Sequence, residues 1–337
     1  MQLRVLGILI MLLVGCENGQ ADADACEHES VFGDGAPAPW FPQWQLMFPN
    51  VPFEAFFDAP VLIGLGGHES SCLPDQWLSD ESSLSKLSGT KTVFVCYGDV
   101  DGCVSQTRRQ TIEFVTEYSA PARTPESFAI DRDDARIVSW NHYVTDFERG
   151  ERVDDEYRQD VTRIGTPGNA TTDVIVLGAG GVITIETCST VTNAPGPDFA
   201  VFENGVNDTF LELAFVEVSS DGEHFVRFPN VYTGLAPIGP YEGHDPTTFR
   251  GFAGQYRFGF GTPFDLSVLE EHPDVSAGLI DLNDINYVKL IDIIGNGEAV
   301  DSFNSPIFDP YPTQGSAGFD LVGLAVLSGA LTADCTE

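Results

Sequence analysis

Short apolar runs separated by turn residues are the main pattern of this chain from Phe128 onward. The runs are rich in Val, Ile and Phe, and Gly, Asn and Asp stand between them. Such runs are typical of β-strands, and their close spacing is typical of a β-sandwich or barrel. In order, they are DVIVLGAGGVITIET, DFAVFEN, LAFVEVSSDGEHFVRF, INYVKLIDIIG and FDLVGLAVL. Helical periodicity is nearly absent, since only SVLEEH at 267–272 predicts one or two helical turns. We therefore expect an all-β domain over residues 128–330.

A smaller β-region is predicted before this domain, over residues 31–122. It opens with a stretch rich in Pro and aromatic residues. Apolar runs of the kind expected for strands follow at 59–65, 91–97 and 110–118. The segment SAPARTPES after Tyr118 is typical of a linker. Nothing in the residues of this region indicates its role.

One glycine-rich segment resembles the start of a dinucleotide-binding loop but lacks residues that such a loop requires. Gly178, Gly180 and Gly181 follow an apolar run, but Ile183 stands where the third glycine of GxGxxG is required. The following VITIET alternates as a strand, whereas a pyrophosphate needs the N-terminus of a helix. We predict a hairpin turn at these glycines.

Two further local patterns predict strand geometry. Asp221-Gly222 in EVSSDGEHFVRF is a tight-turn signal between alternating apolar residues, which predicts a β-hairpin. In the closing run GFDLVGLAVL, Phe319 and Leu321 are expected to face the core and Asp320 the opposite side.

The N-terminus predicts export. Arg4 precedes the apolar run 5–14, which is too short to span a bilayer, so residues 1–15 are expected to be a signal peptide. The run ends in Leu-Val-Gly-Cys16, which resembles the lipobox of bacterial lipoproteins. This resemblance implies cleavage before Cys16 and its lipidation, which anchors the chain in a membrane. Residues 16–30 would form a polar tether, and Glu17 favours the outer membrane.

Six cysteines remain after Cys16, and an even number in an exported chain predicts disulfides. Fifteen pairings are open. A local pair among Cys72, Cys96 and Cys103 is favoured, and a bond from Cys188 to Cys335 in the tail 331–337 is a second hypothesis. The six are Cys26, Cys72, Cys96, Cys103, Cys188 and Cys335. Because four of them precede residue 104, the N-terminal β-region is expected to be disulfide-bonded.

The net charge of −35 limits the classes of molecule that the chain can bind. With 51 Asp+Glu against 16 Lys+Arg, the chain repels a phosphate backbone, which excludes nucleic acid as a partner. Divalent cations are attracted instead, although solubility is the simpler explanation of the charge. The sequence contains no HExxH, GxSxG or P-loop motif.

A longer series of motifs resembles a family of bacterial cell-surface proteins. The match runs over residues 135–328 in VLGAGGVITIETCSTVTNAPGPDFAVFEN, ELAFVEVSSDGEHFVRFP, FAGQYRFGFGTPFDLSVL, INYVKLIDIIG and DSFNSPIFDPYPTQGSAGFDLVGLAVL. Members of this family are mostly uncharacterised, exported and tethered, and some accompany TonB-dependent transporters, including cobalamin-type systems. The segment EVSSDG followed by Phe225 also resembles galactose-binding-like, discoidin-like jelly rolls. The resemblance implies a jelly-roll sandwich and a transporter as a candidate partner.

The same resemblance implies a structural Ca²⁺. Related jelly rolls bind calcium where the first and last strands meet a loop, and Ca²⁺ prefers carboxylate and carbonyl oxygens. The candidate ligands are Asp198, Glu203, Asn204 and Asp320. Val322 stands where the family pattern more often has a second acid, which removes one ligand position. It stays open that these acids are only solvated, or that Asp198 caps a turn.

Three functions remain open. The favoured one is a surface-anchored, non-catalytic binding module for a glycan or a small molecule such as a corrinoid. A structural or adhesive envelope protein is the alternative, and a glycan-degrading hydrolase, which needs two facing acids, is less favoured. Binding would gain support if exposed aromatic side chains gathered at one end of the sandwich. The aromatic candidates are Trp140, Tyr241, Tyr256 and Tyr311.

Overall fold

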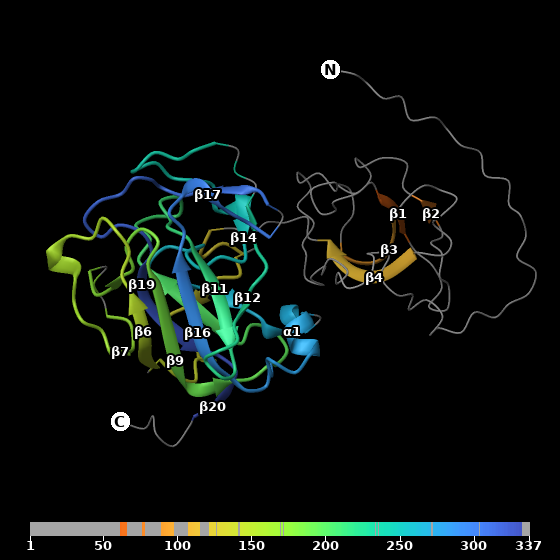
Figure 1. Ribbon diagram of the computed structural model, residues 1–337, viewed down its shortest axis with the longest axis horizontal. Coiled ribbons are helices and arrows are strands. Elements are labelled where there is room, and N and C mark those ends of the chain that lie inside the picture. The colour runs from red at the N-terminus through yellow and green to blue at the C-terminus, as the bar shows by residue number, and fades with distance from the viewer. Residues whose placement is uncertain are drawn as a thin grey trace, which may run out of the picture.

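The computed structural model describes residues 121–331 apart from 126, 141, 169, 171, 233, 235, 271 and 303, together with the backbone of four earlier strands (Figure 1). These four form an antiparallel sheet in the order β2-β1-β3-β4. Their bounds are β1 Val61–Leu65, β2 Gln76–Trp77, β3 Gly89–Tyr97 and β4 Thr107–Phe114. The expected strands at 59–65, 91–97 and 110–118 are thus confirmed in position. The predicted disulfides of this region lie outside the described residues.

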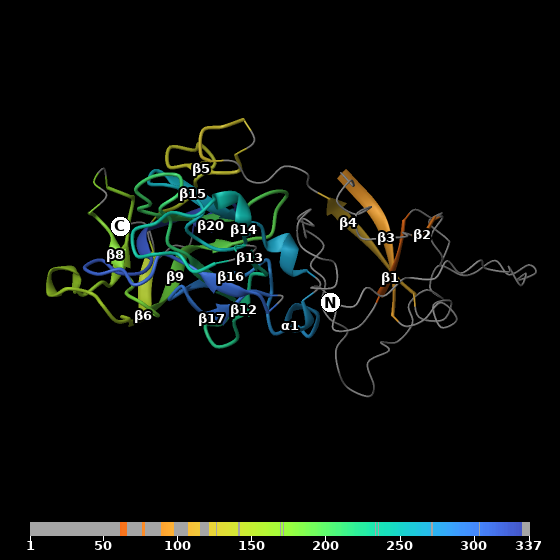
Figure 2. The same cartoon turned by 90° about the horizontal axis from the view of Figure 1, so that it is seen from above.

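The rest of the fold is a sandwich of two antiparallel sheets. One sheet has five strands in the order β5-β15-β10-β19-β8. Its strands are β5 Ile130–Asp131, β15 Phe260–Phe264, β10 Phe199–Glu203, β19 Asp320–Val326 and β8 Ile175–Val176. Seen from above, β5 and β15 lie on one side of the domain and β9 and β16 of the second sheet on the other (Figure 2).

The second sheet has the order β12-β11-β16-β9-β6-β7, and β20 also pairs with β9. Its strands are β6 His142–Glu148, β7 Arg163–Ile164, β9 Val182–Val191, β11 Ala214–Ser219, β12 Val226–Arg227, β16 Ile285–Asp292 and β20 Gly329–Leu331. Two small ribbons flank it, formed by β13 Val231–Tyr232 with β14 Phe249–Arg250 and by β17 Asn296–Val300 with β18 Pro306–Phe308. The short helices are η5 Asp155–Tyr157, η6 Pro246–Thr248, η7 Leu266–Leu269 and α1 Pro273–Ser276. The turns predicted at 267–272 are therefore one 3₁₀ turn and the approach to α1.

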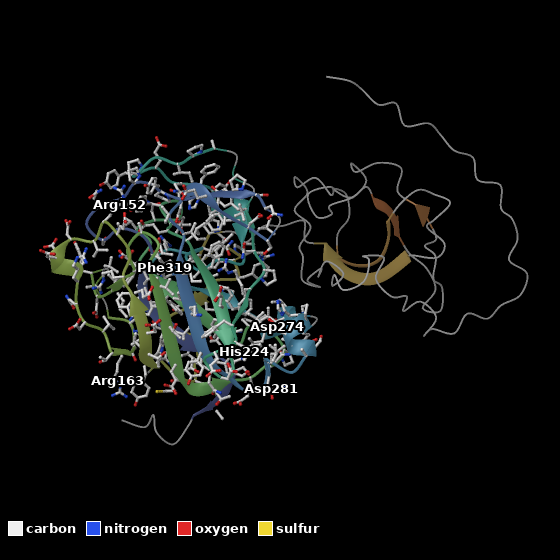
Figure 3. All side chains as sticks on the ribbon, in the orientation of Figure 1. Arg152, Arg163, His224, Asp274, Asp281 and Phe319 are labelled. Atoms are coloured by element: carbon white, nitrogen blue, oxygen red, sulfur yellow. The ribbon has the colours of Figure 1, made fainter. Side chains whose placement is uncertain are left out.

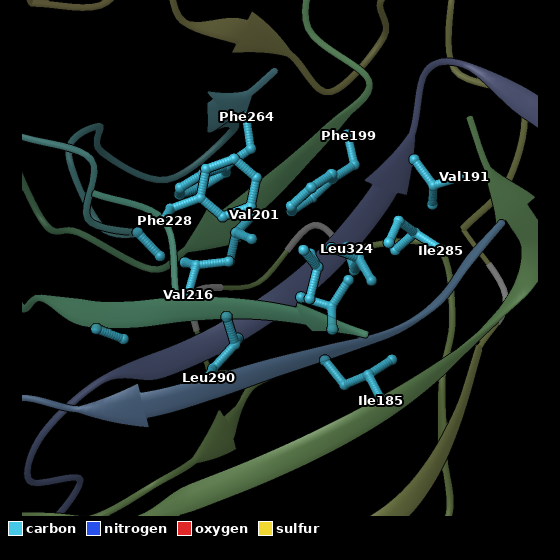
Figure 4. Close-up of a cluster of buried hydrophobic side chains, with 14 of the residues drawn as sticks. Ile185, Val191, Phe199, Val201, Val216, Phe228, Phe264, Ile285, Leu290 and Leu324 are labelled. Atoms are coloured by element: carbon cyan, nitrogen blue, oxygen red, sulfur yellow. The ribbon is translucent and has the colours of Figure 1, made fainter. Parts of the chain in front are cut away.

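The main hydrophobic core lies between the two sheets. Figure 4 shows Phe199 and Leu324 of the five-stranded sheet facing Ile185 and Leu290 of the seven-stranded one, and all four are fully buried. Each fully buried aliphatic or aromatic side chain contributes roughly 1.5–3 kcal/mol. Sheet-on-sheet packing of this kind explains the apolar runs of the sequence, because β10 and β19 are covered on both faces.

A bulge in β19 sets which of its side chains enter this core. Glu203 pairs with Leu321 and Phe202 with Gly323, so Val322 is the extra residue. Phe319 and Leu321 face the core, as predicted, but after the bulge the core positions change parity to Leu324 and Val326. Asp320 lies on the face opposite Leu321 and is nevertheless buried.

The glycine segment is not a hairpin, which corrects the prediction made from its sequence. β8 before it pairs with β19, whereas β9 after it pairs with β6 and β16. The turn therefore carries the chain from one sheet to the other. Gly178 and Gly180 have φ near +80°, which favours glycine. The prediction that a strand follows these glycines is confirmed by β9.

The Asp221-Gly222 turn does join a hairpin, as predicted. β11 pairs with β12 through Val218 and Val226, and Gly222 has a φ of +78°. The carboxylate of Asp221 accepts hydrogen bonds from the backbone N–H groups of Glu223 and His224. An acid at this position thus holds the turn in the way that Asx turns do.

Candidate functional site

Five buried carboxyl groups gather at one end of the sandwich, and we call them the carboxylate cluster. They come from strand ends that are far apart in the sequence: the end of β10, the residue two before β11, the end of β16, the residue after β18 and the start of β19. Each is at most 6% exposed. The members are Glu203, Glu212, Asp292, Asp309 and Asp320.

Burial raises the pKa of every member, and repulsion from other members adds to it for all but Asp292. Burial is the larger cause for Glu203 and Glu212, whose pKa values lie well above the usual range, and the charges of Asp320 and Asp309 add to it. Burial likewise places the pKa of Asp309 well above its usual range. It raises the pKa of Asp292 to about 7 and that of Asp320 to about 8. Near neutral pH the cluster therefore holds protons rather than five full charges.

Asp292 has a structural role within the cluster. Its Oδ2 accepts a hydrogen bond of 2.7 Å from the amide of Gly180, and its Oδ1 accepts one of 2.6 Å from the amide of Phe319. Figure 3 shows Phe319 well inside the domain. With both oxygens engaged, Asp292 fastens the glycine turn and the start of β19 to the end of β16.

The other four members each use one oxygen as an acceptor. Glu203 accepts from the amide of Gly205 at 2.6 Å, and Glu212 from the hydroxyl of Thr313 at 3.2 Å. Asp309 Oδ2 accepts from the amide of Leu213 at 2.8 Å, and Asp320 Oδ2 from the Asn204 side chain at 3.1 Å. The second oxygens of Asp309 and Asp320 are buried and have no hydrogen-bond partner. They are two of six buried side-chain atoms without a partner among the described residues, and the Ser316 side chain is a further hydrogen-bond partner of the Asp320 carboxyl group. A buried polar atom without a partner is costly.

Among the described residues, no Lys or Arg side chain forms an ion pair with the cluster. In the described part of the chain, the ion pairs of Lys and Arg involve other acids. His244 Nε2 lies 3.9 Å from Asp309 Oδ1, but burial lowers the pKa of His244 to about 4, so the ring is neutral near pH 7. Among the described residues, no three acid, histidine or cysteine side chains already surround one point as metal ligands do. In this arrangement the carboxyl groups hold protons instead.

The structure brings together three of the four residues that the sequence analysis offered as calcium ligands. Glu203, Asn204 and Asp320 lie at the cluster. Asp198 precedes Phe199, at the other end of β10, where the strand pairs with Val326. Its carboxylate accepts hydrogen bonds from the amides of Ala194 and Leu266. This is the turn-capping role left open from the sequence, and Asp198 is remote from the other three.

Sequence reasoning missed Glu212, Asp292 and Asp309. Each follows or precedes an apolar run, as in LELAF, LIDII and IFDPY, where an acid interrupts otherwise buried positions. This is a weak signal in a chain with 51 acids. Only the strand order brings the three residues to the same end of the sandwich.

A separate hollow of about 560 Å³, which we call the ligand pocket, opens beside β14 and β15. Its wall is mostly apolar and includes four aromatic and three Pro residues, a few polar groups and two arginines. Lining residues include Phe128, Ile130, Arg136, Pro197, Phe228, Pro229, Arg250, Gln255, Tyr256, Thr262, Pro263, Phe264, Asp265 and Val268. Volumes of 300–1,000 Å³ with mostly apolar walls are typical of small-molecule sites.

At the rim of the ligand pocket, an arginine guanidinium group lies beside an exposed phenylalanine ring. The Arg250 guanidinium lies 5.3 Å from the ring centre of Phe128, which is 51% exposed. Arg136 is held by Asp134 through hydrogen bonds of 3.0 and 2.8 Å. Gln255, which also lines the pocket, is buried. Its side-chain amide donates hydrogen bonds to the carbonyl oxygens of Pro246 and Phe249, which fix its position.

The aromatic residues named from the sequence do not gather into one exposed group. Trp140 packs against Phe202 with ring centres 4.9 Å apart, and Tyr256 is buried where it lines the ligand pocket. Tyr241 is 73% exposed and is not among the pocket's lining residues. Tyr311 packs with Arg152. Phe128, which the sequence analysis did not single out, is the exposed ring at the pocket.

The lipidation site and four of the six other cysteines lie outside the described residues, and Cys96 is described only as a backbone position of β3. Cys188 is buried in β9 and disulfide-bonded. Its partner is not among the residues whose side chains the structure describes, so the pairing with Cys335 stays a prediction. Within the described residues, no helix has the length and apolar character needed to cross a membrane.

Comparison with known proteins finds no relative of this chain. No family model, no curated protein and no solved structure matches the chain. The resemblance to bacterial cell-surface proteins therefore stays a prediction from the sequence motifs.

Proposed function

We propose that this chain is an exported lipoprotein, anchored to the cell envelope with the outer membrane favoured, whose β-sandwich is a non-catalytic module that binds a glycan or a similarly small molecule. The ligand pocket carries this proposal. It is open, about 560 Å³ in volume, and walled by aromatic and Pro side chains. A space of this size suits roughly one or two sugar rings better than a whole corrinoid.

The chemistry of the pocket supports binding rather than hydrolysis. Glycoside hydrolysis needs two carboxyl groups that flank the scissile bond. Among the described residues that line the pocket, Asp265 is the one acid. Its Oδ1 accepts a hydrogen bond from the backbone N–H of Ser267. The carboxylate cluster contributes none of the lining residues, so its raised pKa values do not serve chemistry at this pocket.

The finer description of the fold belongs to the same proposal. We assign the sandwich to the jelly rolls because its sheets are antiparallel and the late strand β19 returns beside the early strand β10. Jelly rolls are common among glycan-binding domains. A TonB-dependent transporter is the protein partner that the sequence motifs suggest.

A titration with named probes tests the proposed function. The mature chain without residues 1–16 is screened by thermal shift against oligosaccharides of glucose, galactose and N-acetylglucosamine and against cyanocobalamin. A probe at a hundredfold excess over its Kd stabilises the folded state by about 2.7 kcal/mol. We expect an oligosaccharide to raise the melting temperature.

Variants then locate the response. Phe128→Ala and Arg250→Ala remove the ring and the cation of the rim, and we expect them to weaken binding of that oligosaccharide at least tenfold. Tyr241→Ala is the matched control, since it removes an exposed ring outside the pocket's lining. Equal affinity in all variants, or no response to any probe, would contradict binding at this pocket. Capture of an envelope protein would then favour the structural or adhesive alternative.

A further inference from the structure

The balance of charge at the ligand pocket is the reverse of that in the whole chain. Acids outnumber Lys and Arg by 51 to 16 in the sequence. Among the described residues that line the pocket, however, Arg136 and Arg250 stand against a single acid, Asp265. The summed charge of the molecule repels an anion, but this repulsion is screened beyond about 8 Å at physiological ionic strength. At contact distance, the two guanidinium groups therefore favour a negatively charged ligand.

Arg250 lies where a sugar ring at the rim would meet it. It belongs to β14, and its guanidinium is 5.3 Å from the ring centre of Phe128, whose side chain is half exposed. An exposed aromatic face packs well against the C–H groups of a pyranose ring. In a uronic acid, the carboxylate is bonded to C5 and projects from the edge of the pyranose ring. A sugar packed on Phe128 would therefore bring its carboxylate towards Arg250.

Arg136 supplies a second donor with a fixed orientation. Its Nε and Nη2 donate to the two carboxylate oxygens of Asp134 at 3.0 and 2.8 Å, and Nη1 takes no part in these two bonds. Asp134 offsets part of the positive charge of Arg136, so Arg250 provides most of the attraction. Because a guanidinium carries five N–H donors, each arginine can keep its present contacts and still bind a carboxylate.

We propose that the ligand pocket selects acidic glycans, namely oligosaccharides of uronic acids, over neutral oligosaccharides of the same linkage. This inference rests on the proposed function, because it names the class of glycan that the same pocket takes. Arg250 binds the carboxylate, Arg136 adds a second donor, and Phe128 packs against the sugar ring. The planar fork of a guanidinium matches the two oxygens of a carboxylate, which the alcohol of a neutral sugar lacks. Hydrogen bonds between charged groups are stronger than neutral ones, so the carboxylate should raise the affinity roughly tenfold.

Matched pairs of ligands test this selectivity on the mature chain. One pair is a galacturonic acid trimer and the galactose trimer of the same linkage, and the other is a glucuronic acid trimer and the corresponding glucose trimer. In at least one pair, we expect the acidic trimer to bind roughly tenfold more tightly than the neutral one. Methyl esterification keeps the sugar rings and removes the charge, so it should lower the affinity of the acidic trimer to that of the neutral trimer.

Three variants assign the preference to the pocket. Arg250→Gln keeps an amide donor but removes the charge, so it should weaken binding of the acidic trimer more than that of the neutral one. Asp265→Asn removes the acid of the lining and can still accept the hydrogen bond from Ser267, so it should strengthen binding of the acidic trimer alone. Arg163→Gln is the matched control. It changes the net charge by the same amount as Arg250→Gln at an exposed pair with Tyr143, outside the pocket's lining, and should leave the preference unchanged.

The outcomes separate this inference from the proposed function. Equal affinity for both members of each pair, or a preference that Arg250→Gln leaves intact, would overturn the selection of acidic glycans, whereas glycan binding at the pocket would stand. Loss of the preference in Arg163→Gln would also overturn it, because the effect would then come from the net charge of the chain. If no trimer of either pair binds, the proposed function fails together with this inference.

Discussion

His142 on β6 donates a hydrogen bond of 2.8 Å from its Nε2 to the carbonyl oxygen of Leu324 on β19, and so joins the two sheets. Its Nδ1 accepts the backbone N–H of Cys188 on β9 at 3.3 Å. The ring is fully buried, and burial lowers its pKa to about 4, so the neutral ring with its proton on Nε2 is the form present near pH 7.

Loss of this imidazole should destabilise the sandwich. His142→Ala leaves the Leu324 carbonyl and the Cys188 amide without a partner and opens a cavity, which costs about 2–4 kcal/mol. Urea unfolding of the mature chain measures this loss. The control is His224→Ala, since His224 forms an exposed pair with Asp221 and its removal should change stability far less. Equal losses in the two variants would refute the bridging role.

The carboxylate cluster makes stability depend on pH in a direction opposite to that of ordinary acids. The pKa of Asp320 is raised to about 8 and that of Asp292 to about 7 by burial, so the folded state holds protons that the unfolded state has released. Their contribution is fully present below about pH 4 and is lost as the pH rises through about 7–8. In EGTA, the urea midpoint should fall between about pH 5 and pH 8.

Asp320→Asn serves as the control for this pH effect. The amide does not titrate, so the midpoint of this variant should fall less over the same range. His142 acts in the opposite sense, because its lowered pKa removes stability only as the pH falls below about 6.5. A midpoint that rises steadily from about pH 5 to pH 8 would contradict the protonated cluster.

Gly318 is expected to tolerate no side chain. Its φ is +73°, and a Cβ there would lie 2.6 Å from Asp292 Oδ1. Gly196 has a φ of +92° but no atom within 4 Å of its Cβ position. Gly196→Ala should therefore cost about 1–2 kcal/mol from backbone strain alone, and Gly318→Ala about 1–3 kcal/mol more, from overpacking. Similar denaturation midpoints for the two variants would show that Asp292 does not fasten this turn.

Lipidation rests on the sequence, since Cys16 lies outside the described residues. Cys16→Ala should leave an uncleaved precursor that no longer incorporates labelled palmitate in the producing bacterium. Cys188→Ala, which changes a buried cysteine of β9, is the control and should keep the label. Palmitate incorporation unchanged by Cys16→Ala would rule out the anchor.

Local chemistry made several elements predictable. Asp221-Gly222 marks its hairpin because few residues adopt positive φ easily, and VITIET marks a strand because β-branched residues alternate. Strand pairing over long sequence distances was not predictable in this way. The glycine-rich segment therefore predicts a hairpin from its local sequence, although β8 and β9 belong to different sheets.

The candidate site residues likewise differ in whether the sequence alone could place them. The resemblance to calcium-binding jelly rolls groups Glu203, Asn204 and Asp320 with Asp198, which lies at the other end of β10. Glu212 and Asp309 reach the cluster through loops whose paths no local pattern specifies. The bulge at Val322 also changes which side chains of β19 face the core, and period-two reasoning from Phe319 does not reveal it.

Calorimetric titration of the mature chain with the oligosaccharide that raises its melting temperature tests binding at the ligand pocket most directly. The titration gives the affinity and the number of sites per chain, and its repetition with variants locates the site. We predict saturable binding at one site, at least tenfold weaker in Phe128→Ala and Arg250→Ala and unchanged in Tyr241→Ala. No saturable binding, or equal affinity in all variants, would contradict a binding module that uses this pocket.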